Sequence, residues 1–538
     1  MNLIEIATGR EPVPEYYNFT RDTVEYWAGI RPGALAMWWT DETAQRQQKI
    51  TFIQLADHAK RACAFFHDLG IKPGDRVAVI AHRVPQWWYA ILGLIRLGAV
   101  PIPGTPLLTA ADITYRLAVA GAVAVVTDDA AMAKIESFAG RKIAIGQATA
   151  DWIDFNQGMA QARTDFDPAL TRATDPGIIY FTSGTSGEAK MVLHSQASYG
   201  IAHAITGHYW LDLQPSDMIW ALADTGWGKT AWSNMYGPWI MGACVFVMDM
   251  RGKFDPNLVL RSLCDFPISV FCAPATALRL LVRKDLKSYH FSCLRHCVSA
   301  GESLNAPLYS TWLNGTGLHI YEGYGQTEMV LAVCNVRSHG LPIHPGSMGH
   351  AAPGFTVGIV DNDGNELPDG TEGNLAIRVN PTRPVGMFVE YWKNPQETAS
   401  RYKGDWYLTG DSALRDEEGY LWFVGRSDDV INSASYRIGP SEVESSLLLH
   451  PAVLECAAIG APDEMRGEVV KAFIVVREGY TPGETLKKEI QTHCKRVTAP
   501  YKYPRQIEFV DALPKTVNGK VRRGELRRRE HLKPPATR

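Results

Sequence analysis

A short loop at residues 182–190 concentrates the residue types that bind polyphosphate. It reads Thr182-Ser183-Gly184-Thr185-Ser186-Gly187-Glu188-Ala189-Lys190 and follows the apolar, strand-like stretch Gly177–Phe181. Glycines let a loop bend tightly and let backbone N–H groups come close to an anion. The hydroxyl groups add hydrogen-bond donors, and Lys190 adds a positive charge. We interpret the run as a phosphate-binding loop; a flexible polar surface turn is the competing interpretation.

A second glycine-containing stretch, residues 223–230, offers a different interpretation. It ends in Gly228-Lys229-Thr230, and an apolar run that ends at Asp249 could supply the magnesium-binding strand of a P-loop NTPase. However, bulky Trp227 stands where phosphates need close backbone approach, and Ala223 takes the place of the first glycine. A P-loop NTPase is therefore the weaker alternative.

The composition indicates an ordinary globular protein of more than one domain. The chain has 538 residues, of which 46% are apolar and 21% charged, and its net charge is −3. This balance gives no sign of a nucleic-acid partner. The most apolar stretch, Trp87–Ile95, is broken by Arg96 and is too short to span a bilayer.

The nine cysteines are scattered without zinc-ligand spacing, which suits a reducing compartment. The N-terminal residues include Glu5 and Glu11 and show no signal peptide. We therefore expect a cytoplasmic location, with an organellar matrix as the alternative if a presequence was removed.

Alternating patterns in the first part of the chain predict an α/β fold with largely parallel sheets. The expected helices are 52–69, 85–97 and 110–120, and the expected strands are 76–80, 99–102 and 122–126.

After about residue 345 the pattern changes to antiparallel strands with tight turns, which predicts a small β-rich layer. The expected strands are 356–360, 373–379, 406–408 and 420–424.

A compact α+β unit of about one hundred residues is expected to close the chain. The stretch 425–440 is polar and turn-rich, and it precedes helices at 441–449 and around 484–497 and strands at 453–459 and 469–476. We place the domain boundary near Asp428, which gives an N-terminal domain, 1–427, and a C-terminal domain, 428–538.

Further motifs follow the phosphate loop in a fixed order. They are Tyr321-Glu-Gly-Tyr-Gly-Gln-Thr-Glu328, Tyr407-Leu-Thr-Gly-Asp411, Gly425-Arg-Ser-Asp-Asp-Val-Ile431 and Pro514-Lys-Thr-Val-Asn-Gly-Lys520. Together they make the chain resemble the acyl-CoA synthetases of the adenylate-forming superfamily, which also contains luciferases and adenylation domains of peptide synthetases. The chain is most similar to the medium-chain acyl-CoA synthetases of fatty acid metabolism.

The resemblance implies a ligase that uses ATP, Mg²⁺ and coenzyme A. In such enzymes a carboxylic acid and ATP give an acyl-adenylate and pyrophosphate, and the thiol of coenzyme A then displaces AMP. The first step requires alignment of the carboxylate with the α-phosphorus and neutralisation of negative charge, which are the usual large contributions in phosphoryl transfer.

The resemblance also implies which residues form the ATP site. Tyr324 is expected on adenine, Thr327 at the α-phosphate, Asp411 at the ribose hydroxyls, and Glu328 as the Mg²⁺ ligand opposite Thr185. The full expected set is Thr182, Ser183, Gly184, Thr185, Ser186, Gly187, Lys190, Gly301, Glu302, Glu322, Gly323, Tyr324, Gly325, Gln326, Thr327, Asp411, Arg426 and Lys520. Of these, Lys520, Thr185 and Glu328 are the expected catalytic residues.

The remaining implied roles concern the second half-reaction and the acid. Asp428 matches the hinge about which the family rotates its small domain, so that Lys520 serves adenylation in one orientation and another face serves thioester formation. Trp227 is expected to border the acyl pocket. The expected coenzyme A contacts are Ser435, Tyr436, Arg437, Arg466 and Lys495.

Two departures from the family pattern have expected consequences, while Glu390, which stands where glycine is common, has no explanation. Ala189 replaces the usual proline, so we expect a less rigid phosphate loop with a small effect on nucleotide affinity. Ser435 replaces the usual glycine on the expected pantetheine tunnel, and we expect it to slow or alter thioester formation.

We therefore expect an ATP-dependent acid–thiol ligase acting on a short- to medium-chain acid, branched and aromatic acids included. An adenylate-forming enzyme with another acceptor, such as a carrier-protein thiol, is the nearest alternative, and a non-enzymatic binding module is a distant one. We expect a monomer or homodimer with small-molecule partners and no membrane span.

Overall fold

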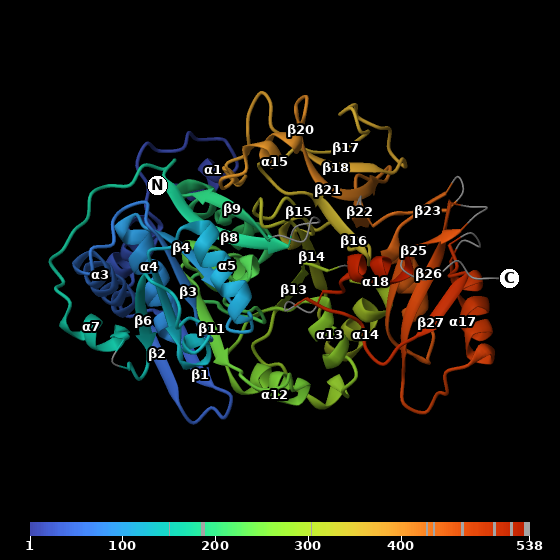
Figure 1. Cartoon of the computed structure of the whole chain (residues 1–538), viewed down its shortest axis with the longest axis horizontal. Coiled ribbons are helices and arrows are strands. Elements are labelled where there is room, and N and C mark those ends of the chain that lie inside the picture. Colours follow the sequence, from blue (N-terminus) through green and yellow to red (C-terminus); the bar gives the residue numbers. More distant parts are fainter. Residues whose placement is uncertain are drawn as a thin grey trace.

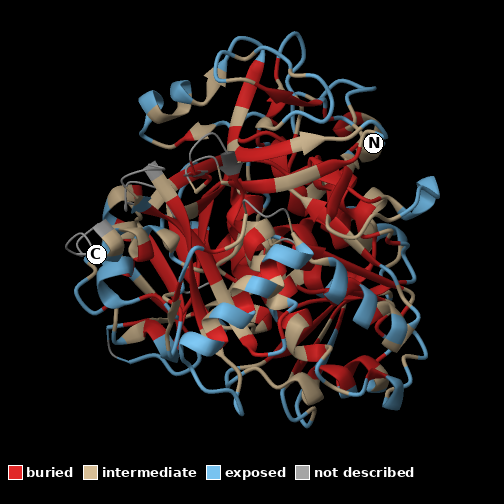
Figure 2. Ribbon diagram, turned by 90° about the vertical axis from the view of Figure 1, so that its right-hand side faces the viewer, coloured by how far each residue is buried: buried red, intermediate tan, exposed pale blue. Residues whose placement is uncertain are grey.

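The chain builds a larger body from its first four hundred or so residues and a smaller one from its C-terminal part (Figure 1). The computed structural model describes residues 1–149, 151–183, 189–302, 304–426, 429–433, 436–463, 467–498, 502–516 and 520–531. Within these ranges, buried residues concentrate along the central sheets and exposed ones along outer helix faces and loops (Figure 2).

One 14-stranded sheet runs through the larger body. Its parallel half consists of β14 (Ile320–Tyr324), β13 (His296–Ala300), β12 (Val270–Cys272), β10 (Met218–Ala221), β11 (Cys244–Asp249) and β1 (Leu35–Asp41), with β2 (Gln47–Thr51) antiparallel at the edge. Its antiparallel half consists of β15 (Val333–Cys334), β16 (Ser347–Ala351), β22 (Leu421–Arg426), β21 (Trp406–Arg415), β18 (Gly373–Arg378), β17 (Val357–Val360) and β20 (Tyr402–Lys403). The small β-rich layer predicted after residue 345 is therefore a continuation of the main sheet.

Two further sheets complete the larger body. A parallel sheet has the order β4 (Val100–Gly104), β3 (Arg76–Ile80), β5 (Ala124–Asp128), β6 (Arg141–Ile145) and β7 (Ile153–Asp154). A three-stranded antiparallel sheet pairs β8 (Pro176–Ser183) with β9 (Ala189–Ser195) and β9 with β19 (Glu390–Tyr391).

The helices of the N-terminal part begin and end where the sequence carries the corresponding signals. Thr51 caps α3 (Phe52–Asp68) and Thr109 caps α5 (Ala110–Ala120) with capping boxes. Helix α4 (Pro85–Leu97) begins at proline and ends before Gly98 in the left-handed conformation. Helices α4 and α5 pack on the parallel sheet and α3 packs on α4, so the predicted α/β alternation is confirmed.

Helices on the other side of the main sheet bury a second set of aromatic residues. Side chains such as Trp220, Phe246 and Phe271 pack against α12 (Pro256–Asp265), α13 (Ala275–Leu281) and α14 (Ala306–Thr316). The shorter helices are α1 (Leu3–Ala7), α2 (Tyr26–Ile30), α6 (Asp129–Met132), α7 (Phe155–Gln161), α8 (Gln196–Gly200), α9 (His203–Ile205), α10 (Gly228–Ala231), α11 (Gly237–Ile240) and α15 (Pro395–Ser400).

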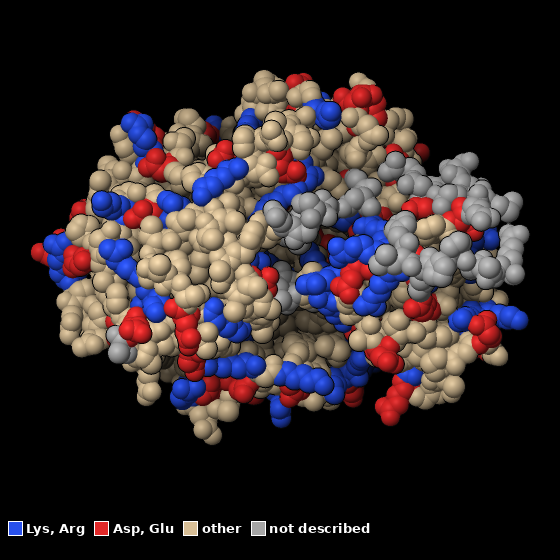
Figure 3. Space-filling view, viewed as in Figure 1, with Lys and Arg blue, Asp and Glu red and all other residues tan. Residues whose placement is uncertain are grey.

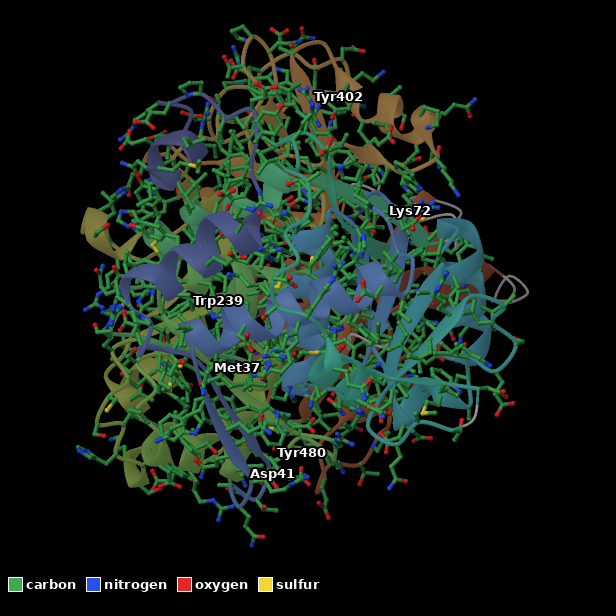
Figure 4. The ribbon with its side chains drawn as sticks, turned by 90° about the vertical axis from the view of Figure 1, so that its left-hand side faces the viewer. Met37, Asp41, Lys72, Trp239, Tyr402 and Tyr480 are labelled. Carbon is green, nitrogen blue, oxygen red and sulfur yellow. The ribbon has the colours of Figure 1, made fainter. Side chains whose placement is uncertain are left out.

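Helix α11 connects the edge of the main sheet to the helices that cover it. Met37 and Trp239 lie close together in Figure 4, and Trp239 donates an indole hydrogen bond of 2.9 Å to the carbonyl of Ala36 on β1. Both side chains are buried. This junction holds β1 and β11 against the helical layer.

The smaller body is an α+β unit with its own core. Its sheet has the order β24 (Tyr436–Ile438), β23 (Ile431–Ser433), β26 (Gly467–Val476) and β25 (Val453–Asp463), with β27 (Gln506–Phe509) also on β26. The helices are α16 (Pro440–Leu448), α17 (Glu484–Val497) and α18 (Arg523–His531). The α+β prediction is confirmed, but the stretch expected to be only turns contains the short strands β23 and β24. The placement of the boundary at Asp428 stays a prediction, because that residue lies outside the described ranges.

Candidate active site

The phosphate-loop motif joins the antiparallel strands β8 and β9. Thr182 ends the apolar part of β8 and lies opposite Lys190 on β9, so the two strands hold the ends of the motif together. Residues 184–188, which include the expected ligands Gly184, Thr185, Ser186 and Gly187, lie outside the described ranges, and of Ser183 only the backbone is described.

Lys190 is held by side chains that sequence reasoning did not single out. Its ammonium group forms an ion pair with Glu397 on α15 and lies 5.2 Å from the ring centre of Tyr391. Tyr391 in turn donates a 2.7 Å hydrogen bond to Glu328 Oε1. The segment 390–400 thus contacts both the phosphate-loop motif and the expected metal ligand.

The first half of the Tyr321–Glu328 motif forms strand β14. Tyr324 at the end of β14 donates a 2.6 Å hydrogen bond to Asp411 Oδ2, and Gln326 Nε2 donates to the same oxygen at 2.7 Å. Arg426 lies opposite Asp411 in the β21–β22 ladder, with its Nη1 3.4 Å from Asp411 Oδ1. Four residues expected at the nucleotide are therefore brought together.

The buried carboxyl group of Asp411 is the electrostatic centre of this cluster. Burial raises its pKa, while the charge of Arg426 and the hydrogen bonds from Tyr324 and Gln326 act in the opposite direction. The charge of Lys520 also lowers the pKa of Asp411, so this lysine of the smaller body lies within electrostatic reach of the nucleotide cluster.

Lys520 is exposed on a short hairpin before α18. Its carbonyl accepts a 2.7 Å hydrogen bond from the backbone of Thr516, and its backbone N–H donates to the Thr516 hydroxyl at 3.2 Å. Lys and Arg side chains gather around the hollow between the two bodies (Figure 3). Lys520 therefore carries an exposed positive charge on the smaller body.

Thr327 is positioned by two buried rings behind it. His194 donates from Nε2 to the Thr327 carbonyl at 2.7 Å, and the hydroxyl of Tyr199 donates to the same oxygen at 3.0 Å. Burial lowers the pKa of His194 to about 3, so its ring is neutral. The strand pattern of β9 carries no hint of this contact, because it joins residues far apart in the chain.

Glu322 points into the protein interior. Its carboxylate accepts a 2.9 Å hydrogen bond from the backbone of Leu304, and burial raises its pKa to about 8. Gly323 and Gly325 allow close packing, since an added Cβ would lie 2.8 Å or less from Trp210 and 2.4 Å from Trp232, respectively.

The segment expected to line the adenine pocket follows β13. Gly301 is exposed with open space where a Cβ would lie. Glu302 accepts a 3.1 Å hydrogen bond from the backbone of Thr276. Ser303 lies outside the described ranges.

The 223–230 stretch does not form a phosphate cradle in this structure. Lys229 donates a 3.1 Å hydrogen bond to the carbonyl of Ala300, and Trp227 is the residue before the short helix α10. Gly228 faces Thr327, because an added Cβ would lie 3.8 Å from the Thr327 hydroxyl. A cavity beside this loop is lined by residues that include Trp88, Trp220 and Asn234. The loop thus borders the nucleotide cluster from the side expected for the acid.

Of the five residues expected at coenzyme A, only Lys495 has a described side chain, so their grouping stays a prediction. Lys495 lies on α17, exposed, with its ammonium 4.1 Å from the ring centre of Tyr503. Tyr436 and Arg437 belong to β24, and only their backbone is described. Ser435, Arg466 and the hinge residue Asp428 lie outside the described ranges.

The described residues offer neither a metal-binding cluster nor a membrane-spanning helix. They contain no cluster of three or more His, Cys, Asp or Glu side chains suited to a metal ion. None of the helices in these ranges combines the length and apolarity needed to cross a membrane. All nine cysteines lie within the described ranges and are unpaired.

Known proteins match the chain over nearly its whole length. The family described as AMP-binding enzyme matches residues 24–392, and its C-terminal domain matches residues 442–520. The mitochondrial acyl-coenzyme A synthetase ACSM5 of Rattus norvegicus is 46% identical over 98% of this chain and 93% of its own. The mitochondrial acyl-coenzyme A synthetase ACSM3 of Homo sapiens is 44% identical over 96% of this chain and 90% of its own.

Solved structures also match the chain over nearly its whole length. The anthranilate CoA ligase AuaEII, in complex with anthranoyl-AMP, superposes with a TM-score of 0.88 at 30% identity and covers 99% of each chain. A benzoate CoA ligase from Burkholderia xenovorans superposes with a TM-score of 0.84 at 27% identity, over 95% of this chain and 100% of its own. The chain therefore belongs to the AMP-binding enzyme family, and the resemblance to acyl-CoA synthetases is confirmed. The two alternative interpretations, a P-loop NTPase and a non-enzymatic binding module, are therefore wrong.

Proposed function

We propose that this protein ligates a carboxylic acid to coenzyme A through an acyl-adenylate, releasing AMP and pyrophosphate. The observation that carries the proposal is the convergence on Asp411 of Tyr324, Gln326 and Arg426 from the larger body and of the charge of Lys520 from the smaller one. A buried carboxylate suits a ribose diol, and a mobile cation opposite it suits a reacting phosphate.

In the first step, a carboxylate oxygen of the acid attacks the α-phosphorus of ATP, and the bond from that phosphorus to the pyrophosphate oxygen breaks. Asp411 accepts hydrogen bonds from the ribose hydroxyls, and the Thr327 hydroxyl donates to the α-phosphate. Lys520 neutralises charge that accumulates on the phosphate and acyl oxygens. Thr182, Lys190 and the residues between them hold the β- and γ-phosphates.

The residues present fit a magnesium ion bound together with ATP. Glu328 Oε1 accepts the hydroxyl of Tyr391, and Glu328 Oε2 has no hydrogen-bond or ion-pair partner among the described residues. Magnesium is usually bound by one or two carboxylates together with substrate phosphates, so a single oriented glutamate, with Thr185 opposite, suffices. Bound there, the ion would neutralise phosphate charge.

In the second step, the sulfur of coenzyme A attacks the acyl carbon and AMP leaves. We propose that the domain 428–538 rotates about Asp428 relative to 1–427 between the two steps. The rotation would present Ser435, Tyr436, Arg437, Arg466 and Lys495 to coenzyme A, whose phosphates suit these cations. The exposure of Lys520 and the effect of its charge on Asp411 are consistent with a residue that serves one orientation.

The acid is short to medium in length, with branched and aromatic acids included. Trp227 borders the acyl group, since the adjacent Gly228 faces Thr327. The anthranilate and benzoate ligases among the similar structures support an aromatic acid. We place the protein in the reducing interior of a cell; the mitochondrial relatives favour an organellar matrix over the cytoplasm.

A two-part assay tests this function. Purified protein is incubated with ATP, Mg²⁺ and a panel of straight, branched and aromatic acids, and pyrophosphate and AMP are measured with and without coenzyme A. We expect pyrophosphate with a matching acid alone, and AMP turnover only when coenzyme A is added. Pyrophosphate release without turnover on coenzyme A would instead favour another acceptor, such as a carrier-protein thiol.

A further inference from the structure

A single carboxylate on α15 holds two cations of the nucleotide site. Glu397 Oε1 forms an ion pair with Lys190 and accepts hydrogen bonds from Arg401 Nε at 3.1 Å and Nη2 at 2.8 Å. All three side chains are largely buried, with exposed fractions of 13% for Lys190, 26% for Glu397 and 20% for Arg401. The contact is therefore partly shielded from water and from salt.

Lys190 needs such a partner when no polyphosphate is bound. A buried ammonium group without a counter-ion is costly, because it loses its hydration. Within the part of the chain that the structure describes, Glu397 is the one carboxylate within ion-pair distance of Lys190. The ring of Tyr391 covers the ammonium from another side.

Arg401 keeps the carboxylate of Glu397 paired with a cation when Lys190 moves away. Two of its nitrogen atoms donate to Glu397, so the carboxylate stays paired if the lysine moves away. Its third nitrogen, Nη1, lies at Gly410 next to the ribose acceptor Asp411, where an added Cβ would come within 2.9 Å of it. Arg401 is therefore fixed beside the nucleotide cluster while Lys190 can change partners.

We propose that Glu397 is the counter-ion that Lys190 exchanges for the polyphosphate. In the nucleotide-free protein Glu397 holds the lysine, and when ATP binds, the ammonium group moves to the phosphate oxygens while Arg401 keeps the carboxylate. When pyrophosphate leaves, Glu397 takes the lysine back. Glu397 is thus a positioning residue that acts through Lys190. This inference rests on the proposed function, in which Lys190 serves the polyphosphate.

The exchange predicts an effect on ligand affinity opposite to the effect expected if Glu397 only stabilised the structure. Because Glu397 competes with phosphate for the same cation, Glu397→Gln should make anions bind more tightly. We expect the dissociation constants of magnesium pyrophosphate and of α,β-methylene-ATP to fall about three- to tenfold, which corresponds to a partly shielded ion pair. Product release should slow, so that kcat falls together with the KM for ATP.

The experiment measures both ligands by calorimetric titration on the full-length protein. Glu397→Gln is compared with Glu397→Asp, which keeps the charge and should restore affinities near those of the parent. In a Lys190→Met background, Glu397→Gln should change neither constant. Glu5→Gln, which removes a surface partner of Arg10, is the matched control for loss of one negative charge.

Arg401→Gln supplies a second, independent arm. Without Arg401, departure of Lys190 would leave the Glu397 carboxylate without a cation, so both ligands should bind more weakly. This loss of affinity should disappear in the Lys190→Met background. The exchange would be contradicted if Glu397→Gln bound the two ligands more weakly. It would also be contradicted if Glu397→Gln changed their dissociation constants equally with and without Lys190. A parent protein that binds neither ligand would instead contradict the proposed function itself.

Discussion

The hydroxyl of Tyr324 donates a 2.6 Å hydrogen bond to Asp411, and so joins the end of β14 to the middle of β21. The same carboxyl group is in contact with Arg426 on the neighbouring strand and within the field of Lys520. Residues from three widely separated motifs thus share one titratable group. This arrangement makes the nucleotide cluster sensitive to single substitutions and to pH in ways that can be measured.

Replacing Lys520 by alanine should abolish adenylation and spare thioester formation. Its charge reaches Asp411 in this orientation, and loss of a cation that stabilises the transition state typically costs about 10²- to 10³-fold in rate. Acid-dependent pyrophosphate release and conversion of supplied acyl-adenylate to acyl-CoA are measured separately. Lys515→Ala, on the same hairpin but paired with Glu455, is the control and should retain both steps. Loss of both steps in Lys520→Ala would contradict the assigned role.

The KM for ATP should rise as the pH falls. Burial raises the pKa of Asp411, and protonation removes the acceptor charge that the ribose hydroxyls need. Arg426→Gln removes a charge that lowers this pKa, so in this variant the rise in KM should begin at a higher pH. Arg415→Gln, which lies on the strand of Asp411 but is paired with Asp369, should follow the parent curve. Identical pH profiles for Arg426→Gln and the parent protein would refute this account.

Replacing Glu322 by glutamine should alter how stability depends on pH. Burial raises the pKa of this carboxyl from 4.5 to about 8. The folded state therefore keeps a proton that the unfolded state releases, and stability falls as pH rises between these values and is constant outside them. Glutamine cannot ionise, so the variant should lack this component. Its melting temperature relative to the parent should increase by a few degrees from pH 5 to pH 8; parallel curves would show that Glu322 titrates normally.

Replacing Ser435 by glycine should speed the second half-reaction. Glycine removes a side chain from the loop expected to line the pantetheine tunnel and tolerates a positive φ. The measurement is single-turnover formation of acyl-CoA from preformed acyl-adenylate, with adenylation followed in parallel as the control. An unchanged rate of thioester formation would show that the serine does not obstruct the tunnel.

Local signals predicted much of the fold because they act within a few residues. Pro85 and Gly98 fix the ends of α4, and Thr109 and Gly121 fix those of α5, so these helices could be predicted to the residue. The hairpin of β23 and β24 was missed because three-residue strands carry little alternation. Its polar sequence looked like a run of turns.

The site was predictable only where a motif carried it. Asp411, Gln326 and Tyr324 are grouped as expected, and this follows from resemblance to the family and not from any local pattern. Glu397 on α15 and Arg401 at the C-cap of this helix stand four residues apart and look like an ordinary surface ion pair of a helix. Only the fold shows that Lys190, distant in the chain, reaches the same carboxylate.

The continuity of the main sheet has a consequence for motion. Between β14, which carries Tyr324, and β21, which carries Asp411, lie only β15, β16 and β22, all joined by ladder hydrogen bonds. Amide protons on these strands should therefore exchange with solvent slowly and together, at the rate of global opening. Those of Thr516 and Lys520, which lie between the bridged residues Lys515 and Val521 and belong to no strand of a sheet, should exchange more quickly and independently. The Asp411 cluster would then open only together with the core of the larger body, while Lys520 lies on a segment that opens separately.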